Sequence, residues 1–205
     1  KIPFGKSFPG INIGLSRMKE GDSCLFIIPS KLAINDYNSF TTLVYYIKLI
    51  KVIKDVKAYD SLQLSYFKNL LEIDSSNYIS SMGIFYKEVV SVNPFDENLK
   101  LKNADSVIIK MNASYLQENK LISFINNKEV TLPLNSTKNY IIDKEIPVTS
   151  GLASAMDTLR IGTQALLIVP YNKAYGESGL FSYLGFLIVP PYTSIIYDIE
   201  VRGKK

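Results

Sequence analysis

The chain has 205 residues, of which 47% are hydrophobic and 20% are charged, enough to bury a core as one large domain or two small ones. Its net charge of +4 comes from 23 basic and 19 acidic residues without Lys/Arg clusters, so we expect no nucleic-acid partner. The sequence contains no histidine and no acidic cluster at ligand spacing, which argues against a metal site, and we expect no cofactor.

No apolar run approaches the roughly 18 residues that span a bilayer, so we expect no transmembrane segment. The chain begins at Lys1 without Met or a signal peptide, which indicates a processed product and leaves room for a lipid anchor on a removed N-terminus. The single cysteine, Cys24, lies in the apolar run CLFII, and we expect it to be buried and unreactive.

Residues 1–55 contain a degenerate copy of a unit that returns near the C-terminus. A shift of 141 positions lays residues 10–35 on residues 151–176 without a gap, and residues 41–49 then match the sequence around Tyr197. Six positions are identical: Gly10/Gly151, Gly21/Gly162, Leu25/Leu166, Ile27/Ile168, Pro29/Pro170 and Ala33/Ala174. The first copy has Ile34 and Tyr46 where the second copy has Tyr175 and Asp198. The passage from residue 35 to 41 is abrupt enough to hide omitted residues.

Residues 56–82 form a connecting segment, in which a helical stripe from Leu62 to Ile73 ends at the sequence DSSN. Packing between two domains explains this helix without a partner, although a partner-binding helix stays open. Residues 83–205 then predict an α+β domain, in which an antiparallel sheet carries one short helix packed across it. Strands are expected over residues 83–92, 105–116, 127–134, 164–170 and 194–201, and the helix over residues 152–159.

The stretch from Gly151 to Val201 resembles the C-terminal half of the FKBP-type peptidyl-prolyl isomerases. The matching residues occur in the family's order: Gly151, Gly162, Pro170, Ala174, Tyr175, Gly176, Pro190, Pro191, Tyr197 and Asp198. The resemblance covers residues 83–205 as a complete FKBP-like domain and residues 1–55 as the C-terminal half of another, and residues 66–89 resemble the helix and entry strand of exported bacterial members.

The resemblance implies that Tyr175 is the catalytic contact, whose hydroxyl donates to the bound substrate. It also implies a shallow apolar pocket whose remaining residues are Val148, Thr149, Leu152, Ile188, Val189 and Tyr197, with Met111, Leu121 and Ile122 on the opposing side. Leu152 takes a floor position usually held by an aromatic residue, and Ile122 replaces an Asp. The same side chains would also suit an ordinary core.

Rotation of an X–Pro bond requires neither a nucleophile nor proton transfer, so a site without His or Cys tolerates this chemistry. Two hypotheses follow from the resemblance. The first is an isomerase of reduced activity that assists the folding of exported proteins in the bacterial cell envelope, in the periplasm or as a membrane-anchored lipoprotein. The second is an inactive module that binds proline-containing polypeptides or a partner protein without turnover.

Overall fold

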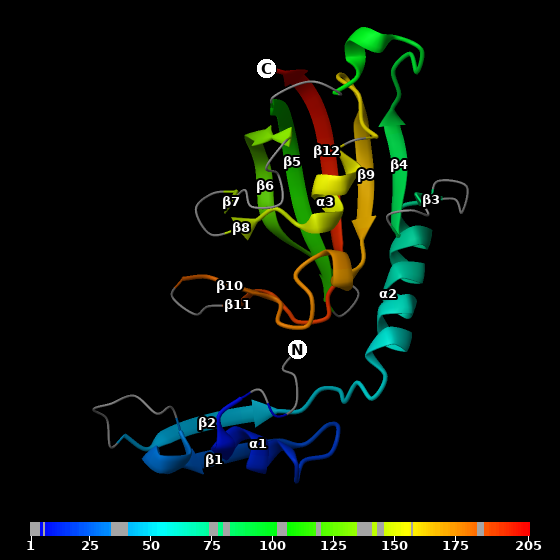
Figure 1. The fold of residues 1–205 in the computed structure, drawn as a ribbon. Helices are drawn as coiled ribbons and strands as arrows, with labels where there is room; N and C mark the ends of the chain where they lie inside the picture. Colours follow the sequence, from blue (N-terminus) through cyan, green and yellow to red (C-terminus); the bar gives the residue numbers. More distant parts are fainter. Residues whose placement is uncertain are drawn as a thin grey trace. The chain divides into compact units, whose positions relative to one another are not determined.

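The computed structural model describes residues 5, 7–33, 41–73, 78–79, 83–101, 106–117, 120–134, 141–142, 146–156, 158–183 and 187–205. The chain divides into two compact units, Lys1–Val56 and Lys57–Lys205 (Figure 1). Residue 34 and most of the passage from residue 35 to 41, on which two sequence interpretations depend, lie outside the described residues.

The second unit is built on a six-stranded antiparallel sheet with the strand order β3-β4-β9-β12-β5-β6 (Figure 1). Its strands are β3 (Tyr78–Ile79), β4 (Ile84–Val90), β5 (Ser106–Gln117), β6 (Lys120–Pro133), β9 (Gln164–Val169) and β12 (Ile195–Lys204). Every second residue of β5 is buried from Val107 to Tyr115, because successive side chains of a strand point to opposite faces. The predicted antiparallel sheet is therefore confirmed.

One short helix, α3 (Ser150–Ala155), packs against the inner face of this sheet. Leu152, Ala155 and Met156 are completely buried there, in one cluster with the inward side chains of β5, β9 and β12. The helix is shorter than the expected residues 152–159. Leu159 follows it in a turn and is still buried, so apolar spacing marked the buried positions beyond the end of the helix.

The outer face of the sheet is covered at one end by α2 (Val56–Leu70). Phe67 of this helix is 1% exposed and packs with Ile168 of β9 and Ile196 of β12. At the start of the helix, the buried carboxylate of Asp60 accepts a hydrogen bond from the hydroxyl of Ser194. The sequence pattern predicts that this helix connects two domains. In the structure, its residue Phe67 belongs to a core cluster of the second unit.

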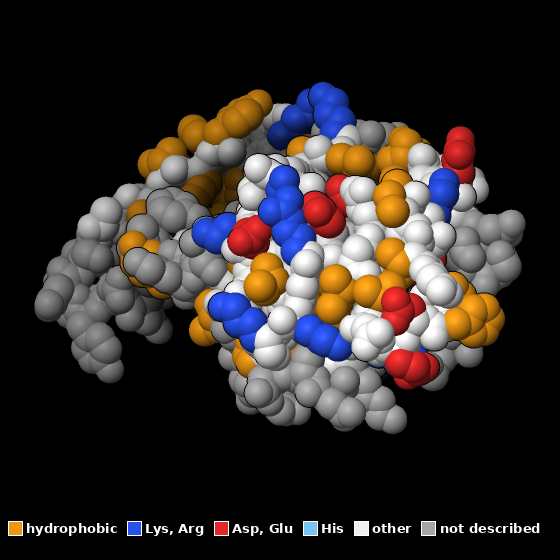
Figure 2. Space-filling view, turned by 90° about the horizontal axis from the view of Figure 1, so that it is seen from above, with side chains coloured by type: hydrophobic (Ala, Val, Ile, Leu, Met, Phe, Trp, Pro, Cys, Tyr) orange, Lys and Arg blue, Asp and Glu red, His pale blue; other side chains and the backbone are white. Residues whose placement is uncertain are grey.

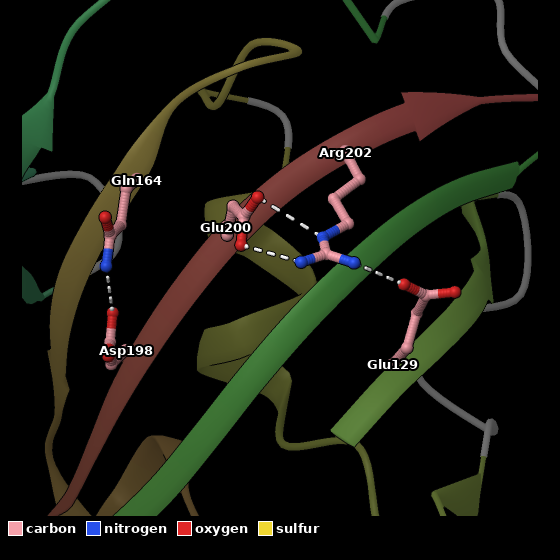
Figure 3. Close-up of polar contacts among 5 residues, drawn as sticks. All are labelled: Glu129, Gln164, Asp198, Glu200 and Arg202. Carbon is pink, nitrogen blue, oxygen red and sulfur yellow. Dashed lines mark hydrogen bonds and ion pairs between the residues drawn. The ribbon is translucent and has the colours of Figure 1, made fainter. Parts of the chain in front are cut away.

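Away from α2, the outer face is polar. The side-chain amide of Gln164 donates to the carboxylate of Asp198 over 3.2 Å. Arg202 lies between Glu200 and Glu129, with nitrogen–oxygen distances of 3.2 and 2.8 Å (Figure 3). These contacts link β6, β9 and β12 through groups that remain partly exposed, so each ion pair stabilises the sheet only weakly.

Two small antiparallel pairs complete the second unit. They are β7 (Ile141–Ile142) with β8 (Ile146–Pro147), which leads into α3, and β10 (Leu180–Phe181) with β11 (Leu187–Val189).

Figure 2 shows basic and acidic side chains next to one another on the face in view. Within the described ranges, no helix is both long and apolar enough to cross a membrane, and no three His, Cys, Asp or Glu side chains gather to hold a metal ion.

The first unit contains α1 (Pro9–Leu15), β1 (Ser23–Ile28) and β2 (Leu43–Lys48), and its two strands form a separate antiparallel pair. Ile11, Ile28 and Ala33 make its small core. The expectation that Cys24 is buried is wrong, because its side chain is only half-buried. A two-stranded sheet with one helix has too little surface to enclose Cys24, the second residue of β1.

Candidate functional site

The residues that the resemblance assigned to a pocket mostly come together in the second unit. Met111, Val148, Leu152, Val189 and Tyr197 belong to its main apolar cluster and are buried, and Tyr175 and Ile188 pack at the margin of that cluster. Thr149 is also buried, next to Tyr197. The site is therefore a closely packed apolar floor with a partly exposed rim.

Tyr175 is held by the turn that follows β9. Pro170 begins a short 3₁₀ helix over Tyr171–Lys173, and the chain then reaches Gly176, whose φ of +66° favours glycine. The amide of Gly176 donates to the carbonyl of Tyr171 over 2.9 Å, and its own carbonyl accepts from the amide of Tyr192 over 3.0 Å. The position of Tyr175 is therefore fixed both by this turn and by the segment after β11, which is bonded to it.

The phenol of Tyr175 donates a hydrogen bond to the carbonyl of Pro147, at 3.2 Å between the oxygens. Burial raises the pKa of Tyr175 well above its ordinary value, and the neighbouring Tyr197 raises it further. The hydroxyl therefore keeps its proton throughout the neutral and mildly alkaline range. A neutral donor of this kind can bind a carbonyl but cannot act as a base near neutral pH.

Thr149 joins α3 to β12. Its hydroxyl oxygen accepts from the amide of Leu152 over 3.2 Å, which caps the helix, and it shares a second hydrogen bond of 3.1 Å with the hydroxyl of Tyr197. Burial raises the pKa of Tyr197 to about 12, although hydrogen bonds with Thr149 and Tyr175 offset part of this effect. Thr149 thus ties the start of α3, which carries the floor residue Leu152, to the Tyr197 hydroxyl on β12.

The opposing side of the site differs from the sequence assignment. Leu121 and Ile122 are 47% and 37% exposed, whereas Phe124 packs against the main cluster. The Phe124 ring meets that of Tyr175 edge-on, with 6.2 Å between centroids, and lies at the same distance from the ring of Tyr115. An aromatic side chain therefore does flank Tyr175, but it comes from a position that the sequence assignment did not include.

The β5–β6 hairpin contains two irregularities, and Phe124 lies at one of them. Met111 pairs with Lys128 and Ala113 with Ile125, but Ser114 already pairs with Ser123, so β6 carries extra residues at two points. Asn127, with a φ of +49°, marks the first, and Phe124 is the extra residue at the second. A residue-by-residue alignment without gaps does not allow for the extra residues of a bulge. The available signal was Phe124 itself, the one aromatic residue of β6.

The rim beyond Tyr175 is formed by the segment around β11. Gly179 lies so close to this segment that an added Cβ would collide with the carbonyl of Val189 and with the backbone of Pro190 and Pro191. Its φ of +71° also disfavours other residues. This close approach holds Val189 in the floor and leaves Ile188 at the margin.

A hollow of about 320 Å³ lies elsewhere on the second unit, near the first turns of α2. Its lining is mixed and includes Lys57, Asp60, Tyr171 and Lys173. None of the pocket residues implied by the resemblance lines it. We therefore place the candidate site at Tyr175, where an aromatic rim, an apolar floor and the hydroxyl donor of Tyr175 come together.

Comparison with known proteins identifies the same part of the chain. The sequence profile of the FKBP-type peptidyl-prolyl cis-trans isomerases matches residues 97–202. The chain is 35% identical over 63 residues to the peptidyl-prolyl cis-trans isomerase FKBP42 of Arabidopsis thaliana, which is 31% of this chain and 16% of that protein. It is 27% identical over 118 residues to FK506-binding protein 5 of Dictyostelium discoideum, covering 57% of this chain and 6% of that protein. The chain thus spans under a fifth of these relatives.

Solved structures show a similar fold. A peptidyl-prolyl cis-trans isomerase from Pseudomonas syringae pv. tomato aligns over 76% of this chain and 99% of its own, with a TM-score of 0.50 and 16% identity. The N-terminal domain of FKBP42 from Arabidopsis thaliana aligns over 60% of this chain and 86% of its own, with a TM-score of 0.44 and 21% identity. At such low identity, the first of these likenesses supports the fold alone.

Proposed function

The chain belongs to the FKBP-type peptidyl-prolyl cis-trans isomerase family, and we propose that residues 83–205 bind proline-containing segments of unfolded polypeptides and catalyse their isomerisation. The barrier to this rotation is about 20 kcal/mol and comes from amide resonance. The twisted transition state has lost that resonance and part of its polarity. A site that binds the twisted amide better than the planar one accelerates the rotation without acid, base or metal.

The observation that carries this proposal is the position of the Tyr175 hydroxyl. It is a neutral donor at the margin of an apolar cluster, and its acceptor in the free protein is the carbonyl of Pro147. A substrate carbonyl that takes the place of the Pro147 carbonyl would accept the same hydrogen bond from the Tyr175 hydroxyl. The Phe124 ring and Ile188 would then contact the proline and its neighbours while the floor excludes water.

We propose that catalysis is slower than in typical family members. Leu152 lies where the resemblance places an aromatic floor residue, which removes ring surface for the proline to pack against. Ile125 follows Phe124 and is buried, so the position after the aromatic residue offers no carboxylate. Without a carboxylate this side of the site is more apolar, which favours substrates with a hydrophobic residue before proline.

A second candidate function is binding without turnover, to proline-containing polypeptides or to a partner protein. The close packing of the floor supports it, because Leu152 is completely buried and Tyr175 already has an acceptor. A ligand would have to displace this internal hydrogen bond before it could be held.

The two candidates are separated by a protease-coupled isomerisation assay on a peptide of the Ala-Leu-Pro-Phe type. Catalysis that is lost in Phe124→Ala but kept in Tyr183→Ala supports the first, because Tyr183 is an aromatic residue at 81% exposure. Peptide binding without any acceleration supports the second. Leu152 is too buried for a polar substitution to be informative, since Leu152→Asp would disrupt the core.

We further propose that the clients are exported proteins and that the protein resides in a bacterial cell envelope, as a lipoprotein if its N-terminus is anchored. The support is the resemblance of residues 66–89 to exported bacterial members. Fractionation of the source cells with an antibody against the second unit tests this. Recovery in the cytosol would contradict it.

A further inference from the structure

The first unit repeats the geometry of one half of the second, residue by residue. An added Cβ at Gly10 would meet the side chain of Ile28 and the carbonyl of Leu32, and one at Gly151 would meet Val169 and the carbonyl of Lys173. In both contacts the partners differ by the same 141 positions as the glycines. Such close helix–strand contacts require the same crossing of helix and strand in both units.

The backbone bonds at the start of the two strand pairs also correspond. The amide of Gly21 donates to Leu49 and the amide of Leu49 to Asp22, each over 2.8 Å. In the second unit, Gly162, Val201 and Thr163 make the same pair of bonds over 2.7 and 2.9 Å.

The strand register is also shared. Phe26 faces Tyr45 in the first unit as Leu167 faces Tyr197 in the second. The strands β1 and β2 are therefore the counterparts of β9 and β12.

In the second unit these two strands occupy the centre of a six-stranded sheet. β4 pairs with the edge of β9 that faces away from β12, and β5 pairs with the edge of β12 that faces away from β9. β6 extends the sheet beyond β5. Phe67 of α2 covers the outer face at Ile168 and Ile196. All these covering elements come from residues 57–134.

Among the described residues of the first unit, β1 and β2 pair only with each other. Ile27 and Val44, the counterparts of Ile168 and Ile196, are 67% and 62% exposed. Their neighbour Tyr46 stands where the second unit has Asp198, so this outer face is more apolar than the one that α2 covers. An exposed apolar face with two open edges is the kind of surface that proteins cover.

On the inner face, Cys24 is likewise more exposed than its counterpart in the second unit. It is half-buried, whereas its counterpart Ala165 is completely buried between the flanking strands. The difference lies in the neighbouring elements rather than in the strand, because Cys24 faces Ile47 as Ala165 faces Ile199.

We propose that the first unit is the C-terminal half of a second FKBP-like domain, and that a segment equivalent to residues 57–134, from the same polypeptide and preceding this half, completes its sheet. In this assignment one strand pairs with β1, as β4 pairs with β9. A two-stranded hairpin pairs with β2, as β5 and β6 do beside β12. A helix with an aromatic residue covers Ile27 and Val44, as α2 with Phe67 covers their counterparts.

The test uses Cys24 as a reporter, because it is the single cysteine of these 205 residues. The 205-residue chain and the complete gene product that contains it are alkylated under native conditions, and the modification of Cys24 is followed by peptide mass spectrometry. We expect alkylation of Cys24 to be about 100-fold slower in the complete product, as for groups that react only on local opening. Amide exchange in β1 and β2 should slow in parallel.

Two charge substitutions check the assigned face. Ile27→Asp should restore fast alkylation of Cys24 in the complete product, because the charge would lie beneath the covering helix. The matched control is Ile13→Asp in α1, since Ile13 is 50% exposed and corresponds to Ser154, a polar position of α3. This control should leave the protection intact.

Three outcomes would overturn the proposal. The first is equal alkylation in the two chains, including the case in which the gene product supplies no preceding half-domain. The second is an equal effect of the two substitutions. The third is protection in the 205-residue chain that rises with its own concentration, which would make a second copy the occupant.

Discussion

The hydroxyl of Tyr175 reaches across the rim of the candidate site and donates to the carbonyl of Pro147 over 3.2 Å. Pro147 ends β8, directly before the pocket residues Val148 and Thr149 and the helix α3 that carries the floor residue Leu152. The bond therefore ties the turn after β9 to the entry of α3. In the free protein it keeps the donor oriented, and in the proposed complex a substrate carbonyl takes the place of Pro147.

Removal of this hydroxyl in Tyr175→Phe should weaken the binding of a Leu-Pro peptide by about 1 kcal/mol, the usual net contribution of one hydrogen bond. This corresponds to about a fivefold change in affinity. Isothermal titration of the purified variants measures it. Tyr183→Phe removes the hydroxyl of an exposed tyrosine, at 81% exposure, and should change nothing. An equal loss of peptide affinity in both variants would show that Tyr175 is not part of the binding site.

Truncation at the opposing side in Phe124→Ala should reduce kcat/KM for the same peptide, because the ring flanks Tyr175 and provides apolar contact to the twisted proline. Aromatic pairs contribute about 1 kcal/mol beyond their buried area, so a loss of about fivefold is expected. Leu121→Ala and Ile122→Ala are the matched controls on the same strand. Larger losses from these controls would favour the sequence assignment over the structural one.

The cap at Thr149 should be sensitive to the loss of its oxygen. Thr149→Ala removes the acceptor of the Leu152 amide and the partner of the Tyr197 hydroxyl, both buried, and should cost about 2 kcal/mol of unfolding free energy. Thr149→Ser keeps the oxygen and should retain most of the stability. Urea unfolding of the three proteins measures the difference. Equal losses from Ala and Ser would assign the effect to the methyl group instead.

The raised pKa of Tyr197 makes stability depend on alkaline pH. The folded state holds the phenolic proton more tightly than the unfolded state, so this contribution is complete below about pH 10 and is lost between pH 10 and 12. Two units of pKa correspond to about 2 to 3 kcal/mol. Denaturant unfolding from pH 8 to 11.5 should show a steeper decline for the wild type than for Tyr197→Phe. Parallel declines would contradict the buried, protonated phenol.

Phe67→Ala tests whether α2 belongs to the second unit. The ring is 1% exposed against Ile168 and Ile196, and its loss should destabilise the second unit by about 3 to 5 kcal/mol. Tyr66→Ala, at 38% exposure on the same helix, should cost much less. If α2 were only a connection, both substitutions would leave the unfolding of the second unit unchanged.

Much of the second unit follows from local pattern. The alternation in residues 105–116 and 194–201 predicts strands that the structure contains as β5 and β12, and Gly162 marks the turn that starts β9. Periodicity does not tell which surface a helix covers, so α2 reads as a connector although Phe67 lies in a core. The spacing of Leu152 and Leu159 likewise reports burial and not helix length.

At the site, the residues near Gly151 and Gly176 could be placed because they lie in short segments without insertions. Tyr175 accordingly bonds to Pro147, two residues before Thr149, and packs against the cluster that contains Leu152. Phe124 could not be placed by counting from Met111, because it is the extra residue of a bulge in β6, and strand alternation does not determine the direction of such a residue. A bulge depends on cross-strand hydrogen bonding, which neighbouring residue types alone do not determine.

In the proposed function, the site at Tyr175 and Phe124 catalyses the rotation of X–Pro bonds. The most direct measurement is exchange NMR on a Leu-Pro peptide with a small amount of the labelled protein. We predict cis–trans exchange peaks that are absent without protein, together with shift changes at Tyr175, Phe124 and Ile188 and none at Tyr183. Shift changes at this site without exchange peaks would establish a binding module instead, and exchange with shifts confined to other residues would place the catalytic site elsewhere.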